Sequence, residues 1–147
     1  MIEIYTDGAC AGNPGPGGWG VLMVDGDATT EISGGDSATT NNRMEMTAAV
    51  EALQATAGAP KVVLHTDSQY LKLGITAWMA RWKRNGWRTA DGKPVKNKDL
   101  WEQIDRLAAG RKIEWRWLRG HAGHPGNERA DELARRGLAA VAPAGTT

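Results

Sequence analysis

The chain has very little cysteine and no long apolar run. Cys10 is the only cysteine among 147 residues, which excludes an internal disulfide and is typical of a reducing compartment. No apolar stretch is long enough to span a bilayer, and the first residues lack the charged-then-apolar pattern of a signal peptide. We therefore expect a cytoplasmic protein that makes no membrane contact, needs no obligate protein partner and is a monomer.

The sequence also lacks internal repeats and any linker that would separate two domains. A chain of 147 residues has the size of one domain with one hydrophobic core. We predict a single domain over residues 1–142 and a disordered tail over 143–147.

Histidine is scarce as well. His65, His121 and His124, together with Cys10, are too scattered to form a convincing zinc-binding pattern. His124 precedes Pro125 and is better explained as shaping the start of a helix.

Basic residues are almost absent from the first part of the chain. Residues 1–60 carry eight acidic residues and one base, Arg43, whereas residues 61–147 carry seventeen bases and nine acids. Between 81 and 98 seven bases face only Asp91, and four tryptophans bracket or interleave them: Trp78, Trp82, Trp87 and Trp101. Charge alone is equally consistent with a solvated helix face. The interleaved indoles favour binding of a sugar-phosphate backbone.

Hydrophobic periodicity predicts an alternation of strands and helices. The expected strands are residues 2–7, 19–24, 28–34, 61–66 and 111–118, with a Gly/Pro loop over 8–18. Four helices are expected. The first begins at Asn42, the second covers 68–84 with a break near Gly74, the third covers 97–109, and the last carries the apolar stripe from Ala130 to Val141. The segment Gly15–Gly20 matches a dinucleotide-binding fingerprint, but it leads into a strand rather than a helix, so we interpret it as a loop.

Four acidic residues stand near the ends of these elements: Asp7, Glu45, Asp67 and Asp131. Each has an ordinary explanation, respectively a turn, a favourable charge at a helix amino terminus, a helix cap and a surface position. Two follow strands and two lie near helix starts, where an α/β sheet collects its site residues. Because clustered acids repel one another, the set predicts bound cations.

The sequence around these acids closely resembles the ribonuclease HI family. Four segments match in order and spacing: Thr6–Gly8, Asn41–Glu45, Thr66–Tyr70 and Gly120–Asp131. The resemblance extends to about residue 140 and implies an α/β fold of the ribonuclease H type. That fold is a five-stranded mixed sheet, three antiparallel strands then two parallel, flanked by helices, with a basic helical protrusion between Trp78 and Trp101. It also implies endonucleolytic hydrolysis of the RNA strand of RNA/DNA hybrids, leaving 5′-phosphate and 3′-hydroxyl ends.

The resemblance further implies roles for individual residues. The resemblance assigns two Mg²⁺ ions in the substrate complex to four catalytic ligands: Asp7, Glu45, Asp67 and Asp131. Mn²⁺ can substitute, and hard oxygen ligands suit Mg²⁺. His121 becomes a mobile histidine that moves protons or helps the product leave. The expected contacts to the hybrid are the amides Asn13, Asn41, Asn42 and Gln69 in the minor groove, Thr40 and Arg43 at a DNA phosphate, and Trp78, Trp82, Lys83, Arg84, Lys96 and Trp101 along the DNA strand.

Three other classes of protein remain as alternatives. A catalytically silent hybrid-binding module would have lost at least one of the four acids, and none is missing here. A DNA-cutting nuclease or integrase of the same fold fits the amides and the basic segment less well. A purely structural α/β domain leaves the acid cluster without an explanation.

Overall fold

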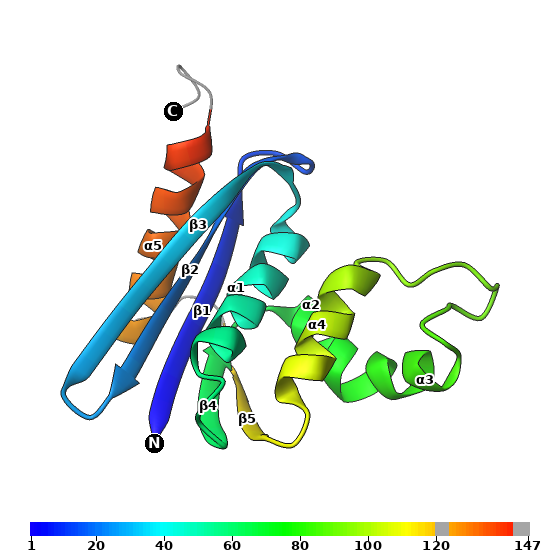
Figure 1. Cartoon of the computed structure of the whole chain (residues 1–147). Helices are drawn as coiled ribbons and strands as arrows, with labels where there is room; N and C mark the ends of the chain where they lie inside the picture. Colours follow the sequence, from blue (N-terminus) through cyan, green and yellow to red (C-terminus); the bar gives the residue numbers. More distant parts are fainter. Residues whose placement is uncertain (120–123, 143–147) are drawn as a thin grey trace.

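The computed structural model of the chain describes residues 1–119 and 124–142. Five strands form one mixed sheet in the order β3-β2-β1-β4-β5 (Figure 1). They are β1 (Ile2–Cys10), β2 (Gly15–Asp25), β3 (Ala28–Thr39), β4 (Lys61–Thr66) and β5 (Lys112–Trp117). The pairs β1–β2 and β2–β3 are antiparallel, whereas β1–β4 and β4–β5 are parallel. The predicted sheet is confirmed.

Helices cover both faces of this sheet. They are α1 (Asn41–Ala55), α2 (Gln69–Leu73), the π-helical turn η1 (Gly74–Trp78), α3 (Met79–Arg84), α4 (Lys98–Ala108) and α5 (Pro125–Val141). A Cβ atom added to Gly17 of β2 would contact Met44 of α1, and one added to the next residue, Gly18, would contact Ala134 of α5. Adjacent strand residues point to opposite faces, so α1 and α5 lie on opposite sides of the sheet. Residues 79–97, here called the protrusion, extend away from the sheet (Figure 1).

The core lies between the sheet and α1, and α4 extends it. Ile4, Met46, Leu53 and Leu64 are fully buried. The strand β4 is buried at five of its six positions, as its nearly continuous apolar sequence predicts for a central parallel strand.

Trp101 belongs to this core, so its predicted contact with the substrate is wrong. Its exposed fraction is 0%, and its ring packs against Gly74 and Tyr70. A Cβ atom on Gly74 would lie 2.0 Å from that ring. The helix predicted to break near Gly74 instead continues through a π-helical turn from α2 into α3. Glycine at position 74 allows the Trp101 ring to lie close to the backbone there.

The connection between β1 and β2 is shorter than predicted. We expected a loop over 8–18, but Ala9 pairs with Gly18 and Cys10 with Gly17, which leaves only residues 11–14 outside the strands. A glycine-rich strand carries no alternating apolar signal, and therefore periodicity ended both strands too early. The third strand likewise runs to Thr39 instead of residue 34. The segment Gly15–Gly20 lies within β2, so it does not form the turn of a dinucleotide site.

None of the helices in the described part of the chain combines the length and the apolar character needed to cross a bilayer. The tail predicted over 143–147 lies outside the described residues, and the domain boundary at residue 142 stays a prediction.

Gly18 offers a test of how closely α5 packs on β2. A Cβ atom there would lie 2.1 Å from the Ala134 carbonyl oxygen and 2.2 Å from the Leu138 amide nitrogen. Because backbone atoms cannot move aside cheaply, Gly18→Ala should lower the free energy of unfolding by about 2 kcal/mol or more, as measured by urea denaturation. Gly58→Ala is the control, since no atom lies within 4 Å of its added Cβ. Equal stability of the two variants would contradict the close packing.

Candidate active site

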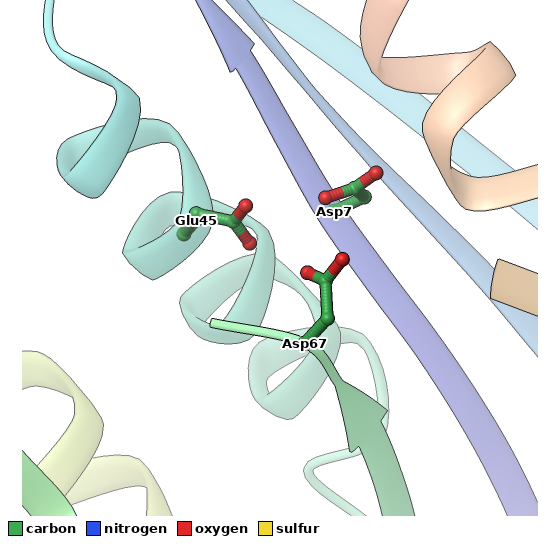
Figure 2. Close-up of side chains that lie close together, drawn as sticks. All are labelled: Asp7, Glu45 and Asp67. Atoms are coloured by element: carbon green, nitrogen blue, oxygen red, sulfur yellow. The ribbon is translucent and has the colours of Figure 1, made fainter. Parts of the chain in front are cut away.

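Three carboxylates from different elements converge near the end of the parallel β1–β4 pairing, in the middle of the sheet. Asp7 lies on β1, Glu45 on α1, and Asp67 directly follows β4. One oxygen from each lies within 4.8 Å of the others. Figure 2 shows the three side chains turned toward a common space. The parallel pairing of β1 with β4 brings Asp7 and Asp67 to the same edge, and α1 supplies Glu45 from one face.

The carboxylates line an open cavity of about 550 Å³. Asp131 of α5 also lines it, so all four predicted acids border one space. The remaining lining residues are Gly8, Ala9, Cys10, Asn41, Asn42, Ser68, Gln69 and Tyr70.

The environment of the acids disfavours negative charge. Burial raises the pKa of Asp7 to about 7, and the charges of Asp67 and Asp131 add to this, while a hydrogen bond from the Gly8 amide (2.9 Å) opposes it. Burial also raises the pKa of Glu45 well above its usual range, and the negative charges of Asp7 and Asp67 raise it further. Asp7 and Glu45 are only 2% and 6% exposed. A bound cation would reverse this cost, because it favours the charged form of each acid.

The donor set fits a hard divalent cation. Asp7 Oδ2 and Glu45 Oε2 are buried and have no hydrogen-bond partner among the described residues. Buried polar atoms normally have partners, so the two oxygens are suited to act as ligands. Within residues 1–119 and 124–142, Asp7, Glu45 and Asp67 form the one group of acidic, His or Cys side chains with metal-binding geometry. Carboxylate oxygens are ligands for Mg²⁺, Ca²⁺ or Mn²⁺ rather than for soft metals.

Asp131 stands apart from the other three acids. It lies in the second turn of α5, and its Oδ2 is 3.0 Å from Nη2 of Arg135 one turn later. The structure therefore brings three of the predicted acids within ligand distance of one another and places the fourth on the cavity wall, paired with a base.

Three of the ordinary explanations for the acids do not hold. Asp7 lies within β1, paired with Gly20 of β2, and not in a turn. The cap of α2 is Ser68, whose hydroxyl accepts a hydrogen bond from the Leu71 amide at 3.1 Å, so Asp67 is not the cap. Glu45 is the fifth residue of α1 and is buried, rather than an exposed charge at the helix start.

The predicted amides lie beside the acids. Asn41, Asn42 and Gln69 line the cavity. Asn13 is exposed, and its side-chain oxygen accepts a hydrogen bond from the backbone N–H of Asn41 at 3.4 Å. The N-cap of α1 is Thr40, whose hydroxyl accepts a hydrogen bond from the Arg43 backbone amide at 3.2 Å, so neither Asn41 nor Asn42 caps the helix. The side chains of Asn41 and Asn42 therefore do not serve as the cap of α1, and both residues line the cavity.

Arg43 is paired with an acid on another helix. Its guanidinium bonds both carboxylate oxygens of Asp99, at 3.1 and 2.7 Å, and the side-chain oxygen of Asn97 at 3.1 Å. The sequence did not indicate this pairing, because 56 positions separate Arg43 from Asp99.

The predicted contacts in the basic segment differ in exposure. Trp78 and Trp82 are half-buried, and their ring centroids lie 5.6 Å apart. Lys83 forms an ion pair with Asp105 at 3.0 Å. Arg84 and Lys96 are exposed and have no ion pair within the described residues. Trp82 packs on the buried Trp101 with a ring-centroid distance of 5.6 Å, whereas Lys83, Arg84 and Lys96 are exposed.

His65 and His124 have packing roles. Nε2 of His65 lies 2.5 Å from the Glu3 carboxylate, and the ring stacks on Tyr5 with a centroid distance of 4.4 Å. His124 directly precedes α5, and its ring lies 5.2 Å from Tyr5. The prediction that His124 shapes the start of the last helix agrees with this position. His121 lies outside the described residues.

Tyr70 and Ser68 are cavity residues to which the sequence assigned no role. Both belong to the segment Thr66–Tyr70 that carried the resemblance. Their position directly after the acid that ends β4 was the available signal.

Comparisons with known proteins agree with this geometry. The family model described as RNase H matches residues 1–139. Ribonuclease H of Caulobacter sp. (strain K31) is 61% identical over 137 residues, which cover 93% of this chain and 89% of that protein. Ribonuclease H of Chelativorans sp. (strain BNC1) is 60% identical over 138 residues, which cover 94% of this chain and 85% of that protein.

Solved structures show the same similarity. LC9-RNase H1, described as a type 1 RNase H with the type 2 active-site motif, superposes with a TM-score of 0.84 at 37% identity, covering 98% of this chain and 74% of that chain. LC11-RNase H1, solved in complex with an RNA/DNA hybrid, gives a TM-score of 0.73 at 25% identity, covering 95% of this chain and 98% of that chain. With the sheet order, the converging acids and these matches in agreement, the chain belongs to the RNase H family.

Proposed function

We propose that the chain is an endonuclease that cuts the RNA strand of RNA/DNA hybrids with two Mg²⁺ ions, leaving 5′-phosphate and 3′-hydroxyl ends. Membership of the RNase H family indicates the reaction, which is cleavage of the RNA strand in hybrids. The observation that carries the metal-dependent chemistry is the set of three carboxylates with oxygens within 4.8 Å of one another.

Asp7 is the centre of the proposed metal site. The charges of Asp67 and Asp131 and a hydrogen bond with Glu45 all act on the pKa of Asp7, so it interacts with each of the other acids. Asp7, Glu45, Asp67 and Asp131 would hold the ions; Mn²⁺ offers the same hard-ligand preference. When bound, such ions make a water molecule nucleophilic and stabilise the charge on the leaving oxygen. The protein holds the ligands ready at the edge of a rigid sheet, where Gly8 orients one Asp7 oxygen through its amide.

The proposed substrate contacts follow from the cavity wall. Asn41, Asn42 and Gln69 present amides that can both donate to and accept from a ribose 2′-hydroxyl, which is the group that distinguishes RNA from DNA. Thr40 caps α1 beside them, and Asn13 of the β1–β2 connection accepts a hydrogen bond from the backbone N–H of Asn41. The exposed bases Lys83, Arg84 and Lys96 would follow the backbone of the DNA strand, flanked by Trp78 and Trp82.

His121 keeps its proposed role in proton movement or product release, on the strength of the sequence resemblance. We also propose a cytoplasmic monomer without an obligate protein partner, in keeping with the single cysteine.

A panel of nucleic acids tests the activity. With Mg²⁺, the protein should cut the RNA of a labelled hybrid internally and leave double-stranded RNA, double-stranded DNA and single-stranded RNA intact, because recognition requires one RNA and one DNA strand. Gel analysis of end-labelled strands identifies the cut strand and its new ends. Cleavage of duplex DNA, or undiminished cleavage with chelator present, would refute the proposal.

Asp7→Asn separates a metal ligand from a structural residue. Cleavage should be nearly abolished, because a neutral amide cannot replace an anionic metal ligand. Below its folded pKa of about 7 and above its unfolded value near 3.8, Asp7 keeps in the native state a proton that the unfolded chain releases. The stability of the metal-free wild type should therefore fall as pH rises from about 4 to about 7, by less than about 4 kcal/mol.

Thermal melts in chelator across this pH range measure the effect. The Asp7→Asn variant should show a shallower decline and a higher melting temperature than the wild type at pH above about 7. Asp27→Asn is the control, because Asp27 is an exposed acid on the β2–β3 turn and should change neither the decline nor the activity. A less stable Asp7→Asn protein at high pH would show that Asp7 has a structural role.

Removing the exposed bases of the protrusion should weaken binding without impairing chemistry. Replacing Lys83, Arg84 and Lys96 by alanine should raise the KM for hybrid and flatten its dependence on salt, because fewer counterions are released on binding. The value of kcat should change much less. The measurement is KM and kcat over a series of salt concentrations.

The control for this triple variant removes the same charge elsewhere. Lys61, Arg106 and Lys112 are exposed at the opposite end of the sheet, where β4 and β5 begin and α4 ends. Their replacement by alanine should leave the salt slope nearly unchanged. Equal slopes for the two triple variants would show that the protrusion does not contact the nucleic-acid backbone.

A further inference from the structure

Three aromatic rings pack together where β1, β4 and the start of α5 meet. Tyr5 of β1 and His65 of β4 are opposite each other in the parallel pairing, and their rings stack with a centroid distance of 4.4 Å and an angle of 9° between the ring planes. His124, which directly precedes α5, adds a third ring, 5.2 Å from Tyr5 and 5.9 Å from His65. We call these three side chains the ring layer.

The ring layer lies next to two of the acids along the strands. Tyr5 is two positions before Asp7 on β1, and His65 is two positions before Asp67. Side chains two positions apart on a strand point to the same face, so Tyr5 and Asp7 are neighbours on one face of the sheet. The backbone of the stacked pair therefore continues, within two residues, into the two carboxylates that Figure 2 shows beside each other.

The start of α5 rests on the same layer. A Cβ atom added to Gly126, the second residue of α5, would lie 2.5 Å from Cε1 of Tyr5. The helix that begins there carries Asp131 in its second turn. The ring layer therefore contacts the three elements that carry Asp7, Asp67 and Asp131.

The rings lie outside the catalytic cavity. His65 is 9% exposed, and its Nε2 is 2.5 Å from the Glu3 carboxylate. The described wall of the cavity includes Asp7, Asp67 and Asp131 but none of the three rings. A substrate in the cavity would not touch the ring layer, so the layer can act on the reaction only through the acids.

Fixed positions matter for these acids because they repel one another. One oxygen of Asp7 and one of Asp67 lie within 4.8 Å of each other, and the charge of Asp67 raises the pKa of Asp7. If the two carboxylates were free to move apart, the metal-free protein would relax, and a cation would bring them together again at a cost in binding free energy. Two rings stacked across β1 and β4 oppose this relaxation.

We propose that Tyr5, His65 and His124 are positioning residues that hold Asp7, Asp67 and Asp131 in place for divalent cations. The inference rests on the proposed function for its reaction, but it concerns cation affinity, which is measured without substrate. Loss of the stack weakens cation binding. Binding of the hybrid depends on other residues, so it is preserved once cations saturate the site.

Tyr5→Leu removes the stacked ring and keeps an apolar side chain. The dissociation constant for Mg²⁺, measured by titration calorimetry without nucleic acid, should rise by about two- to tenfold, the range expected for loss of an aromatic pair. The Mg²⁺ concentration that gives half-maximal cleavage should rise by a similar factor. At saturating Mg²⁺, kcat should stay within about twofold of wild type and KM for hybrid should not change, because every ligand is still present.

Two controls separate positioning from packing. Tyr5→Phe keeps the ring and should bind Mg²⁺ as the wild type does. Trp115→Leu removes a ring from another stacked pair, formed with Trp117 at 5.5 Å on β5, a strand that carries none of the acids. It should lower the melting temperature without changing the dissociation constant for Mg²⁺.

His65→Leu breaks the same stack from the other strand. It should weaken Mg²⁺ binding as Tyr5→Leu does, and the double variant should be no worse than either single one, because both changes remove one interaction. Thermal melts in chelator establish that each variant is folded before the affinities are compared.

The outcomes separate this inference from the proposed function. A Tyr5→Leu protein that melts earlier but binds Mg²⁺ as tightly as the wild type would overturn the positioning role. Additive losses in the double variant, or a Tyr5→Phe protein as weak as Tyr5→Leu, would overturn it too. A wild type that binds Mg²⁺ but leaves hybrids intact would refute the proposed function, while the Mg²⁺ titrations would still decide the positioning role.

Discussion

The parallel pairing of β1 with β4 is the interaction on which the site depends. Ile2 to Tyr5 pair in register with Val62 to His65, which places Asp7 and Asp67 just past the end of this parallel ladder, while β1 itself continues to Cys10. Parallel strands must be joined by a crossover, and the connection from β3 through α1 to β4 brings Glu45 over the same edge. Cavity, acids and amides all follow from this arrangement.

The site is costly for the protein to maintain without cations. Burial and mutual repulsion raise the pKa values of Asp7 and Glu45, and two of their oxygens have no partner among the described residues. The surrounding core opposes this cost: β4 is buried on both faces, and α1 presents seven buried apolar residues besides Glu45. A rigid scaffold can keep unfavourable charges together, and metal binding then recovers the energy.

The protrusion is packed against the rest of the protein through tryptophan rings and exposes a charged surface. Trp101 is completely buried and supports Trp82, whose ring lies 5.6 Å away, and Trp78 packs on both Trp82 and Tyr70. The indoles therefore anchor the protrusion to the body, leaving the exposed bases to meet a polyanion. Within this arrangement, the ion pair between Arg43 and Asp99 joins the helix of a metal ligand to the start of α4.

The order of strands and helices, the four acids and the basic segment could be predicted from the sequence by itself, because periodicity, strand-end positions and charge are local properties. Asp7 and Asp67 were predicted from their places at the ends of expected strands, and the amide residues from the resemblance. Tertiary structure alone decided that Trp101 is core, that glycines 17 and 18 extend β2 under the helices, and that Asp131 lies outside the three-acid group. It also paired Arg43 with Asp99 across 56 positions. Burial and ion pairing depend on which distant segments meet, and one-dimensional patterns carry no information about those distances.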